Sequence, residues 1–153
     1  MTHLGDDPDY LFGEYSGELY FRTFTLPDDV DVEEDAVLFI RTYDNTLDTK
    51  RFYLNTERIF NVLEPHAGNP KEWMLDIGVI YSGILRPGVN CLHSGFAEFG
   101  DDFLFDNLVL MYKTREGESN PVSPEDEIKW VKEINEFTDK LKKEVEQKKK
   151  FFI

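Results

Sequence analysis

The sequence predicts a mainly β protein in which a β-sandwich is followed by one C-terminal amphipathic helix. Turn-forming residues recur at intervals of roughly 8–12 residues up to about residue 120, a spacing typical of sandwiches built from short strands. Aromatic residues make up 14% of the 153 residues, which suits half-buried pleated surfaces better than helices. Beyond residue 120 the apolar spacing changes to three and four, the period of a helix.

Two neighbouring segments are predicted to form the centre of the sandwich. The first, Leu85–His93, contains the Pro87-Gly88 turn, and the second, Asp101–Tyr112, begins with an acidic turn. In the second segment, apolar residues fall on both faces of the expected strand. Because such a strand must lie between two packed layers, we expect it to be covered on both sides.

The remaining strands are predicted from apolar runs that lie between turns. They are expected at 18–26, 36–43, 50–54 and 59–63, with another strand beginning at Trp73. In the first of them, Tyr20, Arg22, Phe24 and Leu26 share one face. The predicted organisation is a flexible leader at 1–13, a sandwich domain at 14–115, a linker at 116–122 and the helix at 123–150.

The helix is predicted from its start signal and its apolar stripe. Ser123 can cap the first turn, Pro124 suits the first helical position, and acidic residues follow. The stripe consists of Ile128, Val131, Ile134, Phe137, Leu141 and Val145. About 25 helical residues extend roughly 37 Å, which is long for a small sandwich. Part of the stripe is therefore expected to contact another chain, and the chain is expected to form a homo-oligomer or to bind a protein partner through this helix.

Charge and composition limit the classes of partner. Residues 1–120 carry 23 acidic and 9 basic side chains, which accounts for the whole net charge of -14. So acidic a domain should repel phosphate backbones, which argues against nucleic-acid binding. The sequence shows neither a signal peptide nor an apolar run long enough to span a membrane, and the lone Cys91 excludes an internal disulfide. These features favour a cytoplasmic or particle-associated protein.

Several short motifs, in the same order along the chain, resemble the galactose-binding-like jelly roll. They are Leu19–Pro27, Phe52–Asn55, Trp73 with Asp76-Ile77, Leu85–Leu92 and Asp102–Leu110. The chain is similar in particular to the non-catalytic sandwich domains of glycoside hydrolases and to related carbohydrate-binding modules. The resemblance covers roughly residues 14–113 and leaves the helix outside; where the family usually has glycine after Leu-Asn, this chain has Thr56. It implies a jelly-roll β-sandwich with carbohydrate-binding ancestry.

Carbohydrate binding requires an exposed aromatic ring beside amide or carboxylate groups. The candidate ligand-binding residues are Tyr53, Asn55, His66, Asn69 and Trp73. Tyr53 is the better exposed aromatic by alternation. Trp73 shares its phase with Leu75 and Ile77, which are expected to alternate into the core, so Trp73 is expected more often in the core than on the surface.

A structural calcium ion is a second candidate ligand. Asp101, Asp102 and Asp106 supply hard oxygen atoms close together in sequence. The resemblance implies such an ion near the last strand, where Asp106 matches the acidic position. An Asp-Asp turn that caps a strand needs no metal, and this simpler interpretation is favoured.

No enzyme motif is found in the sequence. The three histidines lack metal-site spacing, and no nucleophile elbow, P-loop or dinucleotide fingerprint is present. The chain is therefore expected to be a non-catalytic binding module of carbohydrate-binding ancestry. The alternative is a structural or assembly protein that oligomerises through its C-terminal helix.

Overall fold

The computed structural model describes residues 2–4, 14–15, 19–44, 50–59, 72–96 and 103–151. In these ranges the chain forms strands and one helix, in the order β1 (Thr2–Leu4), β2 (Glu14–Tyr15), β3 (Leu19–Leu26), β4 (Ala36–Tyr43), β5 (Lys50–Leu54), β6 (Glu57–Ile59), β7 (Trp73–Ile80), β8 (Gly88–Phe96), β9 (Phe103–Met111) and α1 (Pro124–Phe151). The prediction of a mainly β chain with one C-terminal helix is confirmed.

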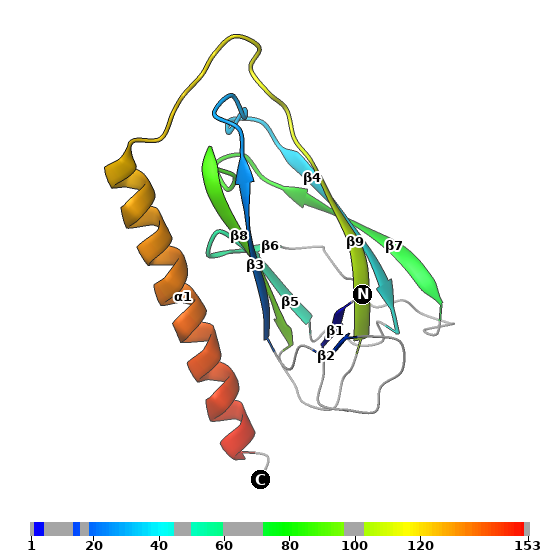
Figure 1. The fold of residues 1–153 in the computed structure, drawn as a ribbon. Coiled ribbons are helices and arrows are strands. Elements are labelled where there is room, and N and C mark those ends of the chain that lie inside the picture. The colour runs from blue at the N-terminus through cyan, green and yellow to red at the C-terminus, as the bar shows by residue number, and fades with distance from the viewer. Residues whose placement is uncertain are drawn as a thin grey trace.

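The strands form two sheets that face each other (Figure 1). One sheet has the order β2-β1-β9-β4-β7 and the other the order β3-β8-β5-β6. All pairings are antiparallel except the short pair of β1 with β2. Residues 2–4, which the sequence places in a flexible leader, form β1 and pair with β9 at 103–105.

The core lies between the sheets and follows the alternation of the strands. In β4 the even-numbered residues Leu38 and Ile40 are buried, and the odd-numbered ones point outward and are partly exposed. Phe52 packs edge-on against Phe105, with ring centres 6.0 Å apart, and Phe103 stacks on Phe105 from the same strand at 5.8 Å. Apolar burial of this kind is the main stabilising contribution to the sandwich.

Strand β9 departs from the prediction that it is covered on both faces. Phe103 and Leu104 are buried, but Val109 and Met111 are 51% and 59% exposed. The cause is a β-bulge: Phe39 pairs with Val109 and Arg41 with Asp106, so β9 carries one extra residue there, and Asn107 has a φ of 48°. The prediction is correct for the start of β9 and wrong for its second half.

Strand β7 also departs from the prediction, because the side chains expected to face the core face outward instead. Trp73, Leu75 and Ile77 point outward and are at least 37% exposed. The inward positions include Asp76, which accepts a hydrogen bond from the Thr42 hydroxyl at 2.8 Å. The prediction that Trp73, Leu75 and Ile77 alternate into the core is therefore wrong. Both faces of β7 carry apolar residues, so hydropathy alone did not identify the buried face.

The helix packs along the outer face of the β3-β8-β5-β6 sheet (Figure 1). Ser123 accepts a hydrogen bond from the Asp126 backbone N–H at 3.1 Å, the cap that the sequence predicts. The buried helical side chains are Trp130, Ile134, Thr138 and Leu141. The stripe therefore covers the chain's own sandwich, whereas Ile128, at its N-terminal end, is 70% exposed.

The connection from β9 to the helix is held against the acidic loop that follows β3. The Asp31 backbone N–H donates to the Lys113 carbonyl, and the Arg115 backbone N–H donates to the Asp29 carbonyl, at 2.8 Å each. The Arg115 guanidinium contacts the carboxylates of Asp31 at 3.0 Å and Glu33 at 2.6 Å. These pairs neutralise part of the acidic loop, beside the backbone hydrogen bonds that hold the two segments together.

Candidate functional site

The residues predicted to bind a ligand do not converge on one site. His66 and Asn69 lie outside the described residues, as do Asp101 and Asp102. Of the remaining candidates, Tyr53 lies beneath the helix, Asn55 lies in the turn between β5 and β6, and Trp73 lies on the outer face of the opposite sheet.

Tyr53 and Asn55 both have structural contacts. The Tyr53 ring packs edge-on against Phe137 of the helix, with centres 5.3 Å apart. Asn55 is 2% exposed; its Nδ2 donates to the Ile84 carbonyl at 2.8 Å and to Asn90 Oδ1 at 2.6 Å, and its Oδ1 accepts from the Cys91 backbone N–H at 2.8 Å. Both donor hydrogens of the Asn55 amide are used, and the side chain is shielded from solvent. Asn55 is therefore not placed to bind a ligand.

Asp106 is engaged by an arginine. Both of its oxygens accept from Arg41, which donates through Nε and Nη2 at 2.7 Å each. The hydrogen bonds from this guanidinium lower the pKa of the Asp106 carboxyl. No group of three or more His, Cys, Asp or Glu side chains within the described ranges is arranged to hold a metal ion. A calcium site at Asp101 and Asp102 stays a prediction.

Cys91 and His93 lie together under the helix, as the two residues of a catalytic cysteine–histidine pair do. Their protonation behaviour is not that of a catalytic pair. Cys91 Sγ lies 3.8 Å from His93 Nε2, and both side chains are buried. Thr138 donates its hydroxyl to the Ile134 carbonyl at 2.9 Å and therefore accepts from His93 Nε2–H at 2.7 Å. Burial raises the pKa of the Cys91 thiol to about 11 and lowers the pKa of His93 to about 4. Both shifts oppose a thiolate–imidazolium pair, so this geometry favours a neutral, structural role.

The buried imidazole predicts a specific pH dependence of stability. The His93 pKa of about 4 in the folded chain lies below the value near 6.5 expected when the chain is unfolded. Between these values the unfolded chain binds a proton that the folded chain does not, so stability falls as the pH drops from about 6.5 to about 4. The expected contribution is on the order of 2–3 kcal/mol over that window.

Urea denaturation at pH 7.0, 5.5 and 4.5 measures this effect when wild type and His93→Gln are compared. The carboxylates are the same in wild type and in the variant, so their contribution cancels. The difference between the two free energies of unfolding therefore reports the contribution of His93 alone. We expect the advantage of wild type over the variant to shrink by about 2 kcal/mol as the pH falls. An unchanged difference would show that His93 does not carry the pH dependence.

The outer face of the five-stranded sheet carries exposed apolar residues that the fold does not explain. We define the β4–β7–β9 face as the outward side chains of these three strands. Cross-strand pairing places Val37 between Met111 and Val79, and Phe39 between Val109 and Ile77. Its most exposed apolar members, 37–59% exposed, are Trp73, Leu75, Ile77, Val79, Val109 and Met111. The helix covers the other sheet and leaves this face uncovered.

One end of the β4–β7–β9 face carries the charged and aromatic groups. The Arg41 guanidinium lies 4.5 Å from the centre of the Trp73 ring while it pairs with Asp106. Tyr43 lies beside the Trp73 ring, with centres 5.5 Å apart. Trp73 and Asp106, predicted as members of two different sites, are thus brought together through Arg41. Sequence reasoning missed Arg41 and Tyr43, although their alternation with Thr42 in β4 places them on one face.

Comparison with known proteins adds no identification. No protein-family model, curated protein or solved structure matches this chain. Within the described part of the chain, no helix is both long and apolar enough to cross a membrane. The fold and surface therefore define a class only, a two-sheet β-sandwich with a helix docked on one sheet and an apolar face open on the other.

Proposed function

We propose that this chain is a non-catalytic β-sandwich module that self-associates through the β4–β7–β9 face. The observation that supports it is the exposed apolar surface formed by Leu75, Ile77, Val79, Val109 and Met111. A contiguous apolar patch of several hundred Å² usually marks an interaction site. The partly exposed Val37 and Phe39 of β4 lie between these residues of β7 and β9 and make the patch continuous across the three strands.

The charge distribution favours a second copy of the same chain as the occupant. The outward charges in the paired rows of the β4–β7–β9 face, Arg41 and Asp106, neutralise each other, although the whole chain has a net charge of -14. A basic partner would find no matching charge on this face. Two copies can pack face to face and bury apolar side chains while their acidic groups remain in solvent.

The helix is the less favoured route to an oligomer. Its apolar stripe contacts β8 and β3 of its own sandwich, so it is not free to pair with a second helix. The exposed apolar residues of the helix are Ile128 and Phe151, near its two ends. The assembly function proposed from sequence is therefore kept, with the contact surface moved from the helix to the sheet.

Substitutions of apolar residues on the β4–β7–β9 face are expected to dissociate the homodimer. Leu75→Lys with Ile77→Lys places two cations in the apolar contact, and we expect the dimer dissociation constant to rise at least tenfold. Sedimentation velocity over a range of chain concentrations measures this constant, and circular dichroism checks that the fold is retained. Ile128→Lys is the control, because it adds a cation at an exposed apolar position on the helix; the single variant Ile77→Lys matches it in charge.

Salt provides an independent test of the same proposal. Two acidic copies repel each other, so raising the ionic strength should strengthen self-association, whereas contact with a basic partner would weaken. A wild-type chain that is monomeric at all concentrations and salt levels would refute the proposal. Dissociation by Ile128→Lys, with no effect of the sheet variant, would instead support the helix as the interface.

Carbohydrate binding is the second candidate function, and Trp73 is the observation that favours it. This ring is 37% exposed, with Tyr43, Arg41 and Asp106 around it. An aromatic ring beside charged hydrogen-bonding groups is the combination that sugars require. Binding on a glycan array that is lost in Trp73→Ala would support this function.

A further inference from the structure

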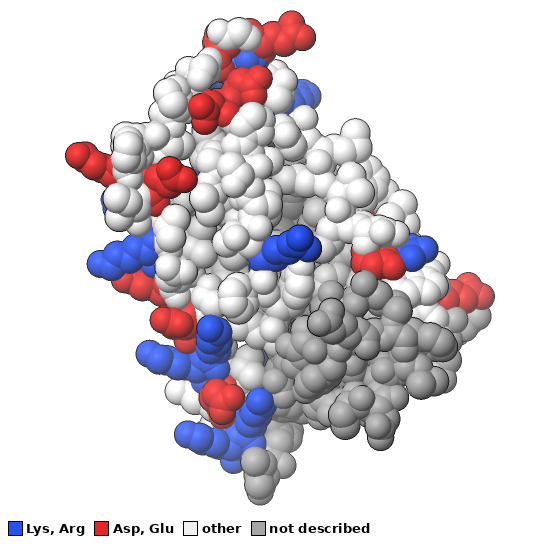
Figure 2. Space-filling model, viewed as in Figure 1, with Lys and Arg blue, Asp and Glu red and all other residues white. Residues whose placement is uncertain are grey.

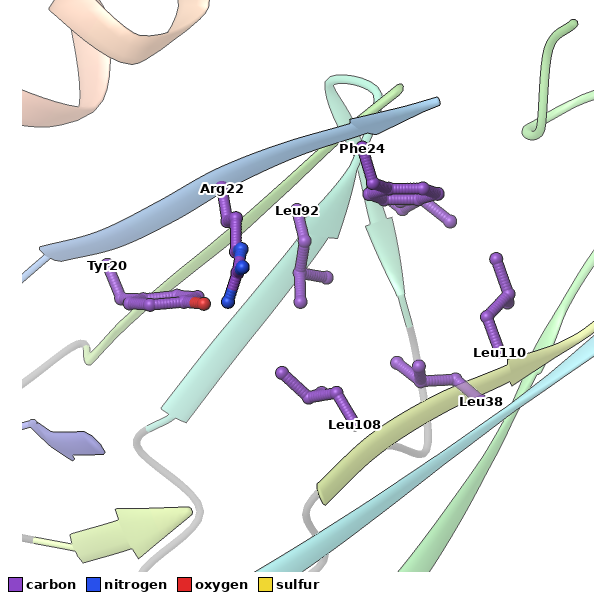
Figure 3. A pocket seen from close by; sticks show the side chains of 8 residues that line it. Tyr20, Arg22, Phe24, Leu38, Leu92, Leu108 and Leu110 are labelled. Atoms are coloured by element: carbon purple, nitrogen blue, oxygen red, sulfur yellow. The ribbon is translucent and has the colours of Figure 1, made fainter. Parts of the chain in front are cut away.

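A cleft between the two sheets has no role in the function proposed above. It has a volume of about 350 Å³. Tyr20, Arg22 and Phe24 of β3 line one side, and Leu38 of β4 with Leu108 and Leu110 of β9 line the other (Figure 3). Leucines of β5 and β8 complete its walls. Pockets of this size and apolar character commonly bind small molecules.

The cleft opens where the two sheets are not joined. Strand β1 pairs with β9 only at Phe103–Phe105, so the rest of β9 has no described neighbour on that side. Strand β3 lies at the end of the other sheet and pairs, within the described ranges, with β8 alone. Two strand edges without a described partner, those of β3 and β9, therefore lie on either side of the opening. Figure 2 shows a broad uncharged area on this side of the molecule, with basic atoms in its middle.

Arg22 is the charged group of the cleft. Its side chain extends from β3 toward the leucines of β9 (Figure 3), and it is classed with the exposed residues. Within the described part of the chain, the structure gives Arg22 no ion pair and no side-chain hydrogen bond. This is unusual in a chain whose net charge is -14, where acidic partners are abundant. A guanidinium that has no partner among the described residues and lies at an apolar opening is suited to a carboxylate.

Tyr20 gives the opening a second polar group in a fixed position. Its ring packs edge-on against Phe105, which is buried, with centres 5.1 Å apart. In Figure 3 the hydroxyl end of Tyr20 lies on the side of Arg22. A phenol hydroxyl can donate to the same anion that the guanidinium binds. The two groups thus form a polar end to an otherwise apolar cleft.

We propose that this cleft binds a medium-chain fatty-acid-like carboxylate, with its headgroup at Arg22 and Tyr20 and its alkyl chain among the leucines. The apolar walls favour the chain, and the Arg22 cation favours a negatively charged head over a neutral or positive one. A volume of about 350 Å³ suits one short alkyl chain better than a two-chain lipid. The proposal is independent of self-association, because the β4–β7–β9 face lies on the outer side of the sheet whose inner side lines the cleft.

Isothermal titration of the full chain with octanoate, nonanoate and decanoate tests the apolar part of the proposal. Each methylene buried in the cleft should strengthen binding roughly fourfold, until the cleft is filled. Decan-1-ol and decylammonium carry the same alkyl chain with a neutral and a positive head. Decanoate is expected to bind at least tenfold more tightly than either. Equal affinities for the three heads would overturn the role of Arg22.

Two variants locate the site. Arg22→Met is expected to weaken decanoate binding at least tenfold while leaving decan-1-ol binding unchanged. Arg51→Met is the matched control: Arg51 lies in the same sheet as Arg22 but on the opposite face, beside the helix, so this variant should retain wild-type affinity. Leu108→Trp fills the cleft and should abolish binding of both ligands. Decanoate binding that survives both Arg22→Met and Leu108→Trp, or vesicles of anionic lipid binding in place of free decanoate, would overturn the proposal.

Discussion

Replacing Asn90 with alanine is expected to lower the free energy of unfolding by about 3–5 kcal/mol, because this one buried side chain makes four hydrogen bonds that hold the turn before β8. Asn90 is fully buried. Its Oδ1 accepts from the Arg86 backbone N–H at 3.0 Å and from Asn55 at 2.6 Å, and its Nδ2 donates to the carbonyls of Arg86 at 2.7 Å and Gly88 at 2.9 Å. Each buried group left without a partner costs roughly 1–3 kcal/mol.

Urea denaturation followed by circular dichroism measures the expected loss. With a slope of about 2 kcal/mol per molar urea, the midpoint should fall by about 2 M. Asn120→Ala is the matched control: this residue is exposed, and the substitution should change stability by less than about 0.5 kcal/mol. A loss below about 1 kcal/mol in Asn90→Ala would show that water replaces the missing bonds.

Strand positions were predictable from the sequence because turn residues and apolar runs act locally. The ranges expected at 36–43 and 50–54 coincide with β4 and β5. The shared face of Tyr20, Phe24 and Leu26 does pack on the core. The Asn55-Thr56 turn forms although both residues have positive φ, 52° and 73°, a conformation that favours glycine and asparagine.

The faces of β7 and β9 were not predictable by alternation alone. In β7, both sets of alternate positions contain apolar residues, and the inward set includes a hydrogen-bonded aspartate rather than only large apolar side chains. In β9, the bulge at Asn107 reverses the alternation halfway along the strand. Apolar residues on both sides of β9 therefore reflect a change of register and not two covering layers.

The candidate sites depend on topology, which local patterns do not show. The helix stripe is clear in the sequence, but the sheet that it covers is not. Docking on the β3-β8-β5-β6 sheet places Tyr53 against the helix and leaves the β4–β7–β9 face without a helix on it. The cleft at Arg22 likewise requires β1 to end its pairing with β9 at Phe105. Arg22 was assigned to the correct face of its strand, but no sequence signal indicates that the opposite sheet lies open there.

Trp130 is expected to couple the helix to the sandwich so strongly that Trp130→Ala destabilises both. The ring is 5% exposed, its Nε1–H donates to the Val89 carbonyl at 2.7 Å, and the Arg86 guanidinium lies 3.1 Å from its centre. Removing a buried tryptophan typically costs 3–5 kcal/mol, and here an arginine stacked on it loses its contact. The loss should be of that size.

The urea unfolding curve of Trp130→Ala depends on whether the helix and the sandwich unfold together as one unit. Trp130 forms a buried cluster with Cys91 and Ile134, and so lies over the strand that also carries Asn90. Undocking the helix would expose Cys91 and His93, so we expect a single unfolding transition whose midpoint shifts by about 2 M urea. Ile128→Ala, at a 70% exposed position on the same helix, should shift it little. Two separate transitions in Trp130→Ala, with the sandwich unfolding at the wild-type midpoint, would mean that the helix is an independent appendage.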